Sequence, residues 1–359
     1  MNTKKKICVI FGTRPDIIKL SPIIQELKKK KANFFLINSG QHFSNNMSSV
    51  FLKNFRINKI KYNLKIKKNK NSLQFIKSFY LKCISILLKE KPNVVIVQGD
   101  TNTCLVGALA AADIKKIYNI DIKIAHIEAG LRSEDFQMPE ESNRIITDHI
   151  SDILFPPTKI QKNNLFSENI KKNIFVYGST IVDSLKKYNL IKNKKSKKYF
   201  MLTIHRYENI DKKIKLKKIF DCINKIANFF KVDILFFCHP NTLKKIKKFN
   251  IKTNFKIKFK RPVPYQVFLK YLYNSNLILS DSGGVQEEAC ILNKNLITLR
   301  NNTERPETLL VNSNYLSDNS YKNIKDRIKF LEKNPIKWSS PYGNNVSKKI
   351  VNKILFYAK

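Results

Sequence analysis

The sequence predicts an α/β protein built from two doubly wound parallel sheets. Short apolar runs of strand length alternate with amphipathic segments of helical period along almost the whole chain, which is typical of repeated βα units. A length of 359 residues is enough for two domains with full-sized cores. Unusual polar residues directly follow several of the apolar runs, at the strand ends where such sheets bind ligands.

The first domain is predicted over residues 1–170, and the C-terminal segment 346–359 is expected to form a helix that packs back on it. Apolar runs bounded by turn residues predict its strands at Ile7–Phe11, Asn33–Asn38, Asn93–Gln98, Lys123–Ile127 and Asp152–Phe155. Apolar residues at helical spacing predict the helices between them at Ile17–Lys30, Ser72–Lys89 and Thr103–Ala112.

The second domain is predicted over residues 171–345, after a linker near Ser167–Asn173. The same criteria predict its strands at Ile174–Tyr177, Tyr199–Ile204, Asp233–Cys238, Phe255–Phe259, Asn276–Ser280 and Asn295–Leu299. The lysine-rich stretch Leu190–Lys198 is expected to be a solvated loop.

The net charge of +41 is the most unusual feature of the composition and suggests a nucleic-acid or membrane-surface binder. The lysines are scattered among Asn and Ile, however, without the interleaved aromatic residues of a nucleic-acid-binding module. We therefore expect neither a specific nucleic acid nor a membrane as a partner. Five of the 9 arginines lie in the motifs described below, at Arg14, Arg132, Arg144, Arg206 and Arg305. This placement indicates sites that need the bidentate fork of a guanidinium group.

The 6 cysteines are scattered, with no CxxC pair, and most lie within apolar runs. This pattern predicts small buried side chains in a reducing compartment and argues against a zinc site. No apolar stretch reaches the roughly 20 residues that span a bilayer. The short apolar run after the basic N-terminus does not end in a small-residue cleavage site, so a cytoplasmic protein is expected. No GxGxxG motif is present, which argues against NAD or FAD as a cofactor.

The segment Asp281–Cys290, DSGGVQEEAC, is the most informative motif of the chain. A predicted strand precedes it, and its two glycines allow a sharp turn before a helix begins. Because unpaired N–H groups and the helix dipole at such a turn attract an anion, Ser282, Gly283 and Gly284 are predicted to hold a phosphate. Glu288, one turn into the helix, suits a pair of sugar hydroxyls. The alternative is a plain strand-to-helix turn without a ligand.

Other candidate residues follow other predicted strands. Arg14 and Lys19 place two cations at a helix start, although Lys19 also fits the general lysine background. Asp100 ends a very apolar strand and is either a helix cap or a catalytic acid. His205 lies at a strand end rather than in mid-strand, which favours ligand contact over core packing. Phe268 offers an aromatic face on which a base can stack, with core packing as the alternative.

Three carboxylates, Glu128, Glu140 and Glu141, come from two motifs that follow one another closely. Arg132 and Arg144 lie nearby in the sequence as orienting partners. Several carboxylates held by arginine at strand ends can transfer protons on two faces of a substrate. A structural ion-pair network is the competing interpretation.

Nine segments in order resemble the family of non-hydrolysing UDP-N-acetylglucosamine 2-epimerases over essentially the whole chain. They are GTRPDIIKLSP, VQGDTNT, HIEAGLRS, MPEESNR, TIHRYEN, CHPN, VPYQVF, DSGGVQEEA and TERPET. The resemblance implies two Rossmann-like domains of the GT-B type that face each other across a cleft binding a UDP-sugar. It also implies a homodimer, and a reaction that needs neither a redox cofactor nor a metal.

The same resemblance assigns roles to individual residues. The expected catalytic residues are Asp100, Glu128, Glu140 and His205. The expected substrate-binding residues are Arg14, Lys19, Arg144, Phe268, Ser282, Gly283, Gly284, Glu288 and Arg305. The implied reaction is anti elimination of UDP to 2-acetamidoglucal, followed by re-addition with C2 inverted, which supplies UDP-ManNAc for surface polysaccharide.

Some positions depart from the family pattern. Asp16 stands where the family usually has Glu, and Tyr207 replaces the second Arg of an HRREN-like segment. Residues 43–47 lack the polar side chains with which bacterial relatives help to bind a second, activating UDP-GlcNAc. Arg206 and His239 remain, so allosteric activation is left open.

Two related activities are alternatives to the epimerisation of UDP-GlcNAc. Hydrolysing 2-epimerases, which release ManNAc, lack the GTRP start and the HxEAGLR segment that are present here. Epimerases of other UDP-2-acetamido sugars are harder to separate, and Leu131 favours the ordinary GlcNAc substrate.

Overall fold

The computed structural model describes residues 5–41, 52–57, 59–66, 72–188, 190 and 198–358. It divides into two compact units, one made of residues 1–187 and 342–359 and the other of residues 188–341. Each unit contains one six-stranded sheet, and every strand pairing in both sheets is parallel. The segment 43–47 and most of the expected loop 190–198 lie outside the described residues.

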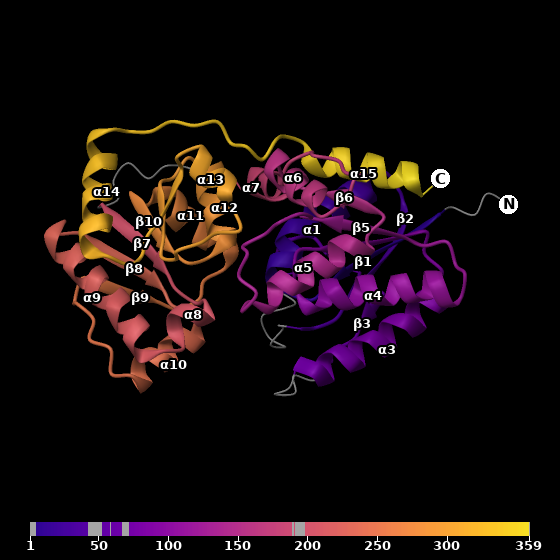
Figure 1. Cartoon of the computed structure of the whole chain (residues 1–359), viewed down its shortest axis with the longest axis horizontal. Coiled ribbons are helices and arrows are strands. Elements are labelled where there is room, and N and C mark those ends of the chain that lie inside the picture. The colour runs from indigo at the N-terminus through magenta and orange to yellow at the C-terminus, as the bar shows by residue number, and fades with distance from the viewer. Residues whose placement is uncertain are drawn as a thin grey trace. The chain divides into compact units, whose positions relative to one another are not determined.

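The sheet of the first unit has the strand order β3-β2-β1-β4-β5-β6 (Figure 1). Its strands are β1 (Lys6–Phe11), β2 (Asn33–Asn38), β3 (Tyr62–Asn63), β4 (Val94–Gln98), β5 (Lys123–Ile127) and β6 (Ile153–Phe155). Its helices are α1 (Arg14–Lys29), α3 (Ser72–Glu90), α4 (Asn102–Ile117), α5 (Pro139–Ile150), α6 (Lys159–Ser167), α7 (Ile181–Lys186) and α15 (Val346–Tyr357).

The sheet of the second unit has the strand order β12-β11-β10-β7-β8-β9. Its strands are β7 (Tyr199–Thr203), β8 (Asp233–Phe237), β9 (Ile257–Lys260), β10 (Leu277–Ser280), β11 (Leu296–Thr298) and β12 (Asn314–Leu316). Its helices are α8 (Tyr207–Ile210), α9 (Lys213–Phe229), α10 (Pro240–Lys248), α11 (Tyr265–Asn274), α12 (Gly283–Ile291), α13 (Pro306–Leu310) and α14 (Tyr321–Lys333).

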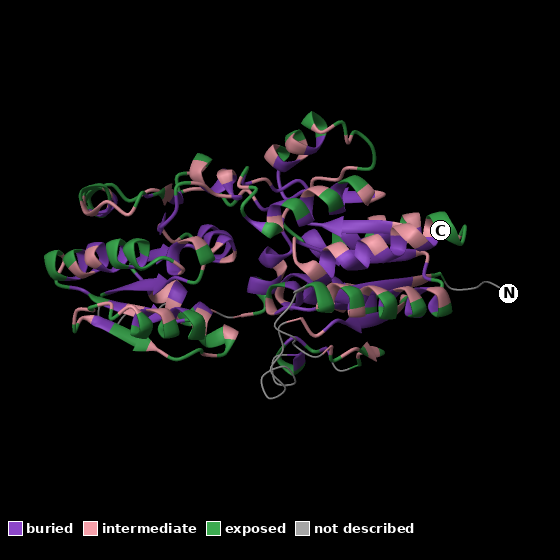
Figure 2. Cartoon of the chain, turned by 60° about the horizontal axis from the view of Figure 1, so that its bottom comes forward, coloured by how far each residue is buried: buried purple, intermediate pink, exposed green. Residues whose placement is uncertain are grey.

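Both faces of each sheet are buried, which explains why the strands read as continuous apolar runs. In β7, Phe200 and Leu202 belong to one core cluster, while Met201 between them belongs to the cluster on the opposite face. Figure 2 shows the same arrangement as buried strands beneath helices with exposed outer surfaces. The 6 cysteines are buried and free, as predicted. None of the helices in the described part of the chain is both long and apolar enough to cross a bilayer.

The predicted strand Ile174–Tyr177 is wrong. Only an isolated bridge between Ile174 and Leu154 forms there, next to β6 of the first unit. The rings of Phe175 and Tyr177 lie 6.0 Å and 6.1 Å from that of Phe155, so these apolar residues cover the first sheet instead of starting the second. Residues 171–187, which the prediction assigned to the second domain, therefore belong to the first unit.

The C-terminal segment returns to the first unit at Tyr342. The Ser179 N–H donates to the Tyr342 carbonyl at 3.0 Å, and a Cβ on Gly178 would lie 2.0 Å from that oxygen. Only a glycine permits this close approach. From there α15 packs along α1, which is the position expected for the C-terminal helix.

Candidate functional site

Each sheet has one point at which its strand order reverses. This point lies between β1 and β4 in the first unit and between β7 and β10 in the second. Open α/β sheets bind ligands beyond the carboxyl ends of strands at such points. The residues that follow these four strands are Gly12–Arg14, Gly99–Asp100, His205–Arg206 and Asp281–Gly284. The motifs predicted from the sequence therefore gather at the two switch points, each within its own unit.

At the start of α1, the loop N–H groups bind a carboxylate of the protein itself. Asp16 accepts hydrogen bonds from the N–H groups of Gly12 and Thr13 at 2.9 Å and 3.0 Å. The Asp16 N–H in turn donates to the Thr13 hydroxyl oxygen at 3.4 Å, which completes a capping box, and the Thr13 hydroxyl donates to the Asp16 carboxylate at 2.6 Å. Arg14 is the first residue of the helix and Pro15 the second, as the motif predicted. Arg14 is half-buried, and the N–H groups of Gly12 and Thr13 beside it already donate to Asp16, so the loop does not offer these two N–H groups to a ligand.

Burial raises the pKa of Asp16 from 3.8 to about 6, against the hydrogen bonds from Thr13 and Gly12 that lower it. Between pH 4 and 6 the folded chain then binds more protons at Asp16 than the unfolded chain does. The contribution of Asp16 to the free energy of unfolding therefore falls by about 3 kcal/mol as the pH rises through this window.

We expect Asp16→Asn to remove this part of the pH dependence. The free energy of unfolding from urea titrations between pH 4 and 7 should fall with pH in the wild type more than in the variant. Other groups cancel in the difference between the two curves. Parallel curves for the two proteins would contradict the raised pKa of Asp16.

Lys19 is not one of the background surface lysines. It is buried, and its Nζ donates to Glu128 Oε1, while Gln98 Nε2 donates to the other oxygen of the same carboxylate. The Glu128 backbone has φ +72°, a left-handed conformation that costs a residue with a side chain free energy. Residues held in such conformations cluster at functional sites, and this one directly follows β5.

Asp100 does not cap α4, because Thr101 is the N-cap and accepts from the Cys104 N–H at 3.2 Å. The Asp100 carboxylate instead accepts from Arg144 Nη2 at 2.7 Å. The Arg144 side chain is only 1% exposed, whereas that of Asp100 is 30% exposed. A buried guanidinium group thus holds an acid that reaches solvent at the switch point of the first sheet. A Cβ on Gly99 would lie 3.6 Å from Glu128 Oε2, which places the second acid beside the same turn.

The three predicted glutamates have different surroundings. Glu141 lies 3.0 Å from Arg144 Nη1 and accepts from the N–H groups of Ser133 and Glu134, so it belongs to the structural ion-pair network. Glu140, half-buried in the first turn of α5, has no hydrogen bond or ion pair among the described residues. Glu140 therefore remains available for a substrate, and Glu141 does not.

Arg132 is not an orienting partner of these glutamates. Its guanidinium group binds Glu168 through two hydrogen bonds of 2.6 Å and 2.7 Å and Asp148 through one of 2.8 Å. Asp148, which sequence reasoning missed, also contacts His126 Nδ1 at 2.7 Å and accepts from the Gly130 N–H at 3.0 Å. A lone acid inside a helix gives no motif, so nothing in the sequence marked it.

His126 connects this network to the turn that carries Asp100. Its Nε2 faces the Gly99 carbonyl at 2.8 Å, and its Nδ1 faces the Asp148 carboxylate, so both nitrogens donate. Burial lowers the pKa of His126, but its interactions with Cys104 and Asp148 raise it well above its usual value. The histidine is therefore a charged structural link and not a proton donor to a ligand.

In the second unit, Asp281 joins the two turns at the switch point. Its buried carboxylate accepts from the N–H groups of His205 and Arg206 at 3.1 Å and 3.0 Å, and from Asn209 Nδ2 at 3.0 Å. The His205 ring remains 42% exposed, with Nδ1 3.4 Å from Asp281. Asp281 thus fixes the backbone of His205 and leaves its side chain accessible to a ligand.

The α12 N-terminus has the features of an anion site. Ser282 is its N-cap, and no side chain of the described residues caps the helix there. A Cβ on Gly283 would lie 2.3 Å from Glu304 Oε1, whereas a Cβ on Gly284 would meet nothing closer than Ser282 Oγ at 3.9 Å. Glu304 cannot easily move away, because Arg206 and Arg300 bind it at 2.7 Å and 2.9 Å.

The two glycines are expected to differ when each is replaced by alanine. Gly283→Ala must displace the clamped Glu304, so we expect a loss of about 1–3 kcal/mol in the free energy of unfolding. Gly284→Ala should leave stability nearly unchanged, because its Cβ would meet open space, and we expect it to weaken UDP binding if the ligand phosphate lies at this turn. Urea unfolding and calorimetric titration with UDP measure both effects. Equal effects of the two substitutions on stability would contradict this assignment.

Glu288, Phe268 and Arg305 lie at the remaining predicted positions of this unit. Glu288 is buried, and its Oε1 accepts from the Tyr265 hydroxyl at 2.7 Å. The half-buried Phe268 ring packs edge-on against Phe237 at 5.5 Å, which is the core contact expected as the alternative to stacking. Arg305 is buried, with its Nη2 3.3 Å from Glu287 Oε2.

The structure also places Arg206 and His239, the residues that left activation open, and Gln41, the described residue that precedes the segment 43–47. Gln41 Oε1 accepts from the N–H and hydroxyl groups of Thr103 at 3.0 Å and 2.7 Å. Arg206 is bound to Glu304, as described above, and the exposed His239 caps α10 by accepting from the Asn241 N–H at 3.2 Å. All three side chains thus have partners within the protein.

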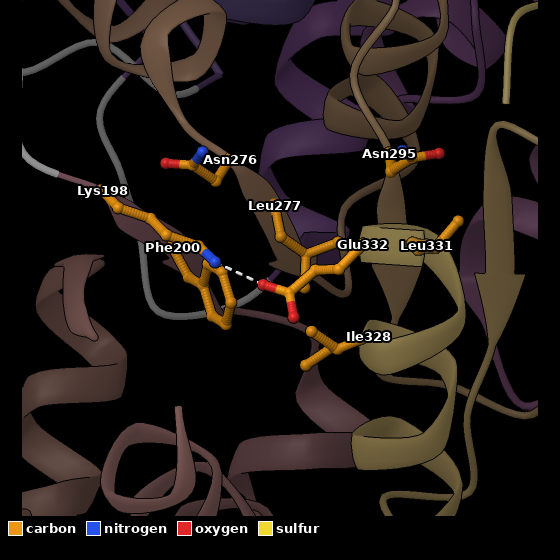
Figure 3. Close-up of a pocket in the computed structure, with 8 residues that line it drawn as sticks. All are labelled: Lys198, Phe200, Asn276, Leu277, Asn295, Ile328, Leu331 and Glu332. Carbon is orange, nitrogen blue, oxygen red and sulfur yellow. Dashed lines mark hydrogen bonds and ion pairs between the residues drawn. The ribbon is translucent and has the colours of Figure 1, made fainter. Parts of the chain in front are cut away.

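A separate hollow lies at the opposite, amino-terminal edge of the second sheet. Phe200 of β7 and Leu277 of β10 line it, and an ion pair between Lys198 and Glu332 crosses it (Figure 3). It contains none of the residues predicted for the site. Within the described residues, no group of three or more His, Cys, Asp or Glu side chains is placed to hold a metal ion.

Comparisons with known proteins point to one enzyme family. The family model for UDP-N-acetylglucosamine 2-epimerase matches residues 25–355. The UDP-N-acetylglucosamine 2-epimerase of Methanocaldococcus jannaschii is 46% identical over 99% of this chain and 100% of its own length. The UDP-2,3-diacetamido-2,3-dideoxy-D-glucuronate 2-epimerase of Pseudomonas aeruginosa is 35% identical over 87% of this chain and 88% of its own length.

Solved structures show the same relationship. The crystal structure of the Methanocaldococcus jannaschii UDP-GlcNAc 2-epimerase in complex with UDP-GlcNAc and UDP has a TM-score of 0.89 at 45% identity, and covers 98% of this chain and 99% of its own. A lipopolysaccharide outer core galactosyltransferase, only 14% identical, has a TM-score of 0.59 over 98% of this chain and 99% of its own, which shows a shared fold alone. The prediction of two Rossmann-like domains of the GT-B type is confirmed.

Proposed function

The chain belongs to the UDP-N-acetylglucosamine 2-epimerase family, and we propose that it interconverts UDP-GlcNAc and UDP-ManNAc without hydrolysis. One observation supports this reaction above the others. Asp100 and Glu128 lie beside one turn at the carboxyl edge of the first sheet, and each is held by its own cation, Arg144 or Lys19. Two acids fixed in this way suit a reaction that removes a proton from one face of a sugar and returns it to the other.

The first step of the proposed reaction is the departure of UDP. The C2 proton of a sugar is not acidic, so breaking the C1–O bond must lead and build positive charge on the ring. The leaving diphosphate needs preorganised donors, and the uncapped α12 N-terminus at Ser282–Gly284 offers them. Arg14 and His205 add positive or donating groups. Phe268, Glu288 and Arg305 would hold the uridine.

The second step is proton removal from C2, in an anti elimination that gives 2-acetamidoglucal. We assign the removal of this proton to one of Asp100, Glu128 and Glu140, and the delivery of a proton to the opposite face to another of them. Asp100 and Glu140 both have exposed surface, whereas Glu128 is buried beside the turn that carries Asp100. UDP then adds back to C1, and the product UDP-ManNAc, in which C2 is inverted, is released.

The proposal is tested by following UDP-GlcNAc with the purified protein in heavy water by NMR. UDP-ManNAc carrying deuterium at C2 is the expected product. Free ManNAc and UDP would instead indicate hydrolysis. An absence of turnover over hours would contradict both activities.

A second candidate substrate is another UDP-2-acetamido sugar. The relative from Pseudomonas aeruginosa motivates it, because its name specifies a diacetamido uronate at 35% identity to this chain. Competition between UDP-GlcNAc and UDP-2,3-diacetamido-2,3-dideoxy-glucuronate in one reaction, followed by NMR, compares the two specificities directly. A higher kcat/KM for the uronate would replace the GlcNAc assignment.

We also propose that the protein acts as a homodimer and that its product supplies surface polysaccharide. Both proposals rest on the family resemblance. Sedimentation equilibrium of the purified chain tests the first, and a monomer at micromolar concentration would contradict it. The second is tested by whether loss of the chain removes N-acetylmannosamine from the surface glycan of its cell.

A further inference from the structure

Tyr265 contacts Glu288 directly, although it lies outside the segment Asp281–Cys290 and received no role in the sequence analysis. It is the first residue of α11, and its hydroxyl donates to Glu288 Oε1 at 2.7 Å. Glu288 lies on α12, so this bond crosses between two helices that pack on the same cluster of the second unit. The contact is therefore tertiary and cannot arise from either helix alone.

The phenol is a permanent donor in this pair. Burial raises the pKa of Tyr265 well above its usual value, and the negative charge of Glu288 raises it further. The Tyr265 hydroxyl is therefore the donor of this bond, and the Glu288 carboxyl group accepts it.

The position of the Tyr265 ring is also fixed. The Tyr188 ring packs edge-on against it at 5.8 Å, and Tyr188 is the first residue of the second unit. A glutamate side chain has three rotatable bonds, the last of which is broadly distributed. A ring that is itself held in place therefore restricts where the carboxylate of Glu288 can point.

We propose that Tyr265 is a positioning residue that orients Glu288 toward the ribose hydroxyls and so sets the preference for ribo- over 2′-deoxyribonucleotides. This inference rests on the proposed function, in which Glu288 receives the ribose. A site built to bind a hydroxyl rejects an analogue without it, because the buried polar group loses its partner. A carboxylate that is free to rotate can adapt to ribose and to 2′-deoxyribose, so it discriminates less between the two nucleotides.

The test measures the affinities of UDP and 2′-deoxy-UDP by calorimetric titration, on the wild type and on Tyr265→Phe. We expect the wild type to bind UDP about 10–100-fold more tightly than 2′-deoxy-UDP, as for a hydrogen bond to a charged group. Tyr265→Phe should lose most of this ratio, through weaker binding of UDP and little change for 2′-deoxy-UDP. The matched control is Tyr271→Phe on the same helix, whose hydroxyl makes no hydrogen bond among the described residues, and it should keep the full ratio.

The outcomes separate this inference from the proposed function. A wild type that does not bind UDP would overturn both. A wild type that binds the two nucleotides equally, or a Tyr265→Phe variant that keeps the wild-type ratio, would overturn the inference alone. An equal weakening of both nucleotides would show a merely structural role and would also overturn it. Glu288→Gln, measured in parallel, should lose the same ratio and tests the ribose contact of Glu288 alone. Tyr188→Leu removes the ring that packs against Tyr265 but not the Tyr265 hydroxyl, so it should lower the ratio even if Tyr265→Phe folds poorly. An unchanged ratio in Tyr188→Leu would contradict the positioning role.

Discussion

Replacing Asp100 by asparagine is expected to slow the turnover of UDP-GlcNAc by about 10²–10⁴-fold, the usual contribution of a general acid or base. The amide keeps the shape of the side chain but cannot take up a proton. Arg144 keeps its second carboxylate partner, Glu141, at 3.0 Å, so the fold should not be affected. Initial rates by NMR and the affinity for UDP by calorimetry measure the two consequences separately.

The control for this substitution is Asp121→Asn. The Asp121 side chain is 82% exposed and, among the described residues, forms an ion pair with Lys123 alone, so its replacement should change nothing. Loss of UDP binding together with turnover in Asp100→Asn would mean that Asp100 holds the ligand and does not transfer a proton. Unchanged turnover would remove Asp100 from the mechanism.

Replacing Glu128 by glutamine is expected to reduce both turnover and stability. The buried ammonium group of Lys19 would lose its carboxylate partner, and breaking a buried ion pair from one side costs about 3–5 kcal/mol. Turnover should fall by about 10²–10⁴-fold for the same reason as in Asp100→Asn. Urea unfolding and NMR rates check the two effects.

The double variant Lys19→Met with Glu128→Gln separates these effects. Removing the ammonium group should restore most of the lost stability, because the charge that the Glu128 carboxylate balanced is no longer in the interior. Turnover should stay low, because the acid is still missing. A double variant that regains turnover would show that Glu128 serves only to neutralise Lys19.

The sequence predicted the fold well because its strands are buried on both faces. β2 and β5 have the predicted bounds, since a doubly buried strand reads as an apolar run that turn residues interrupt. β3 and β12 were missed, because their residues, Tyr62–Asn63 and Asn314–Leu316, do not form an apolar run. The false strand at Ile174–Tyr177 has the right residues for a sheet, but they pack against Phe155.

The positions of the candidate site were predictable, but its contacts were not. Asp100 and Ser282 follow strands at the switch points, and Glu128 follows β5, which pairs with β4, so topology places all three at the carboxyl edges of the sheets. The partners that hold the site, such as Tyr265 on Glu288, lie far away in the sequence. Such pairings depend on how the helices pack against one another. The spacing of apolar residues along the sequence does not predict that packing.

The central claim is that UDP leaves the sugar and adds back, and one measurement tests it directly. UDP-GlcNAc is labelled with ¹⁸O in the bridge between C1 and the β-phosphate and incubated with the protein, and ³¹P NMR follows the label. If the C1–O bond breaks, the freed β-phosphate can rotate, and the label should appear in its non-bridging positions as UDP-ManNAc forms. Epimerisation at C2 with the label still entirely in the bridge would contradict elimination of UDP.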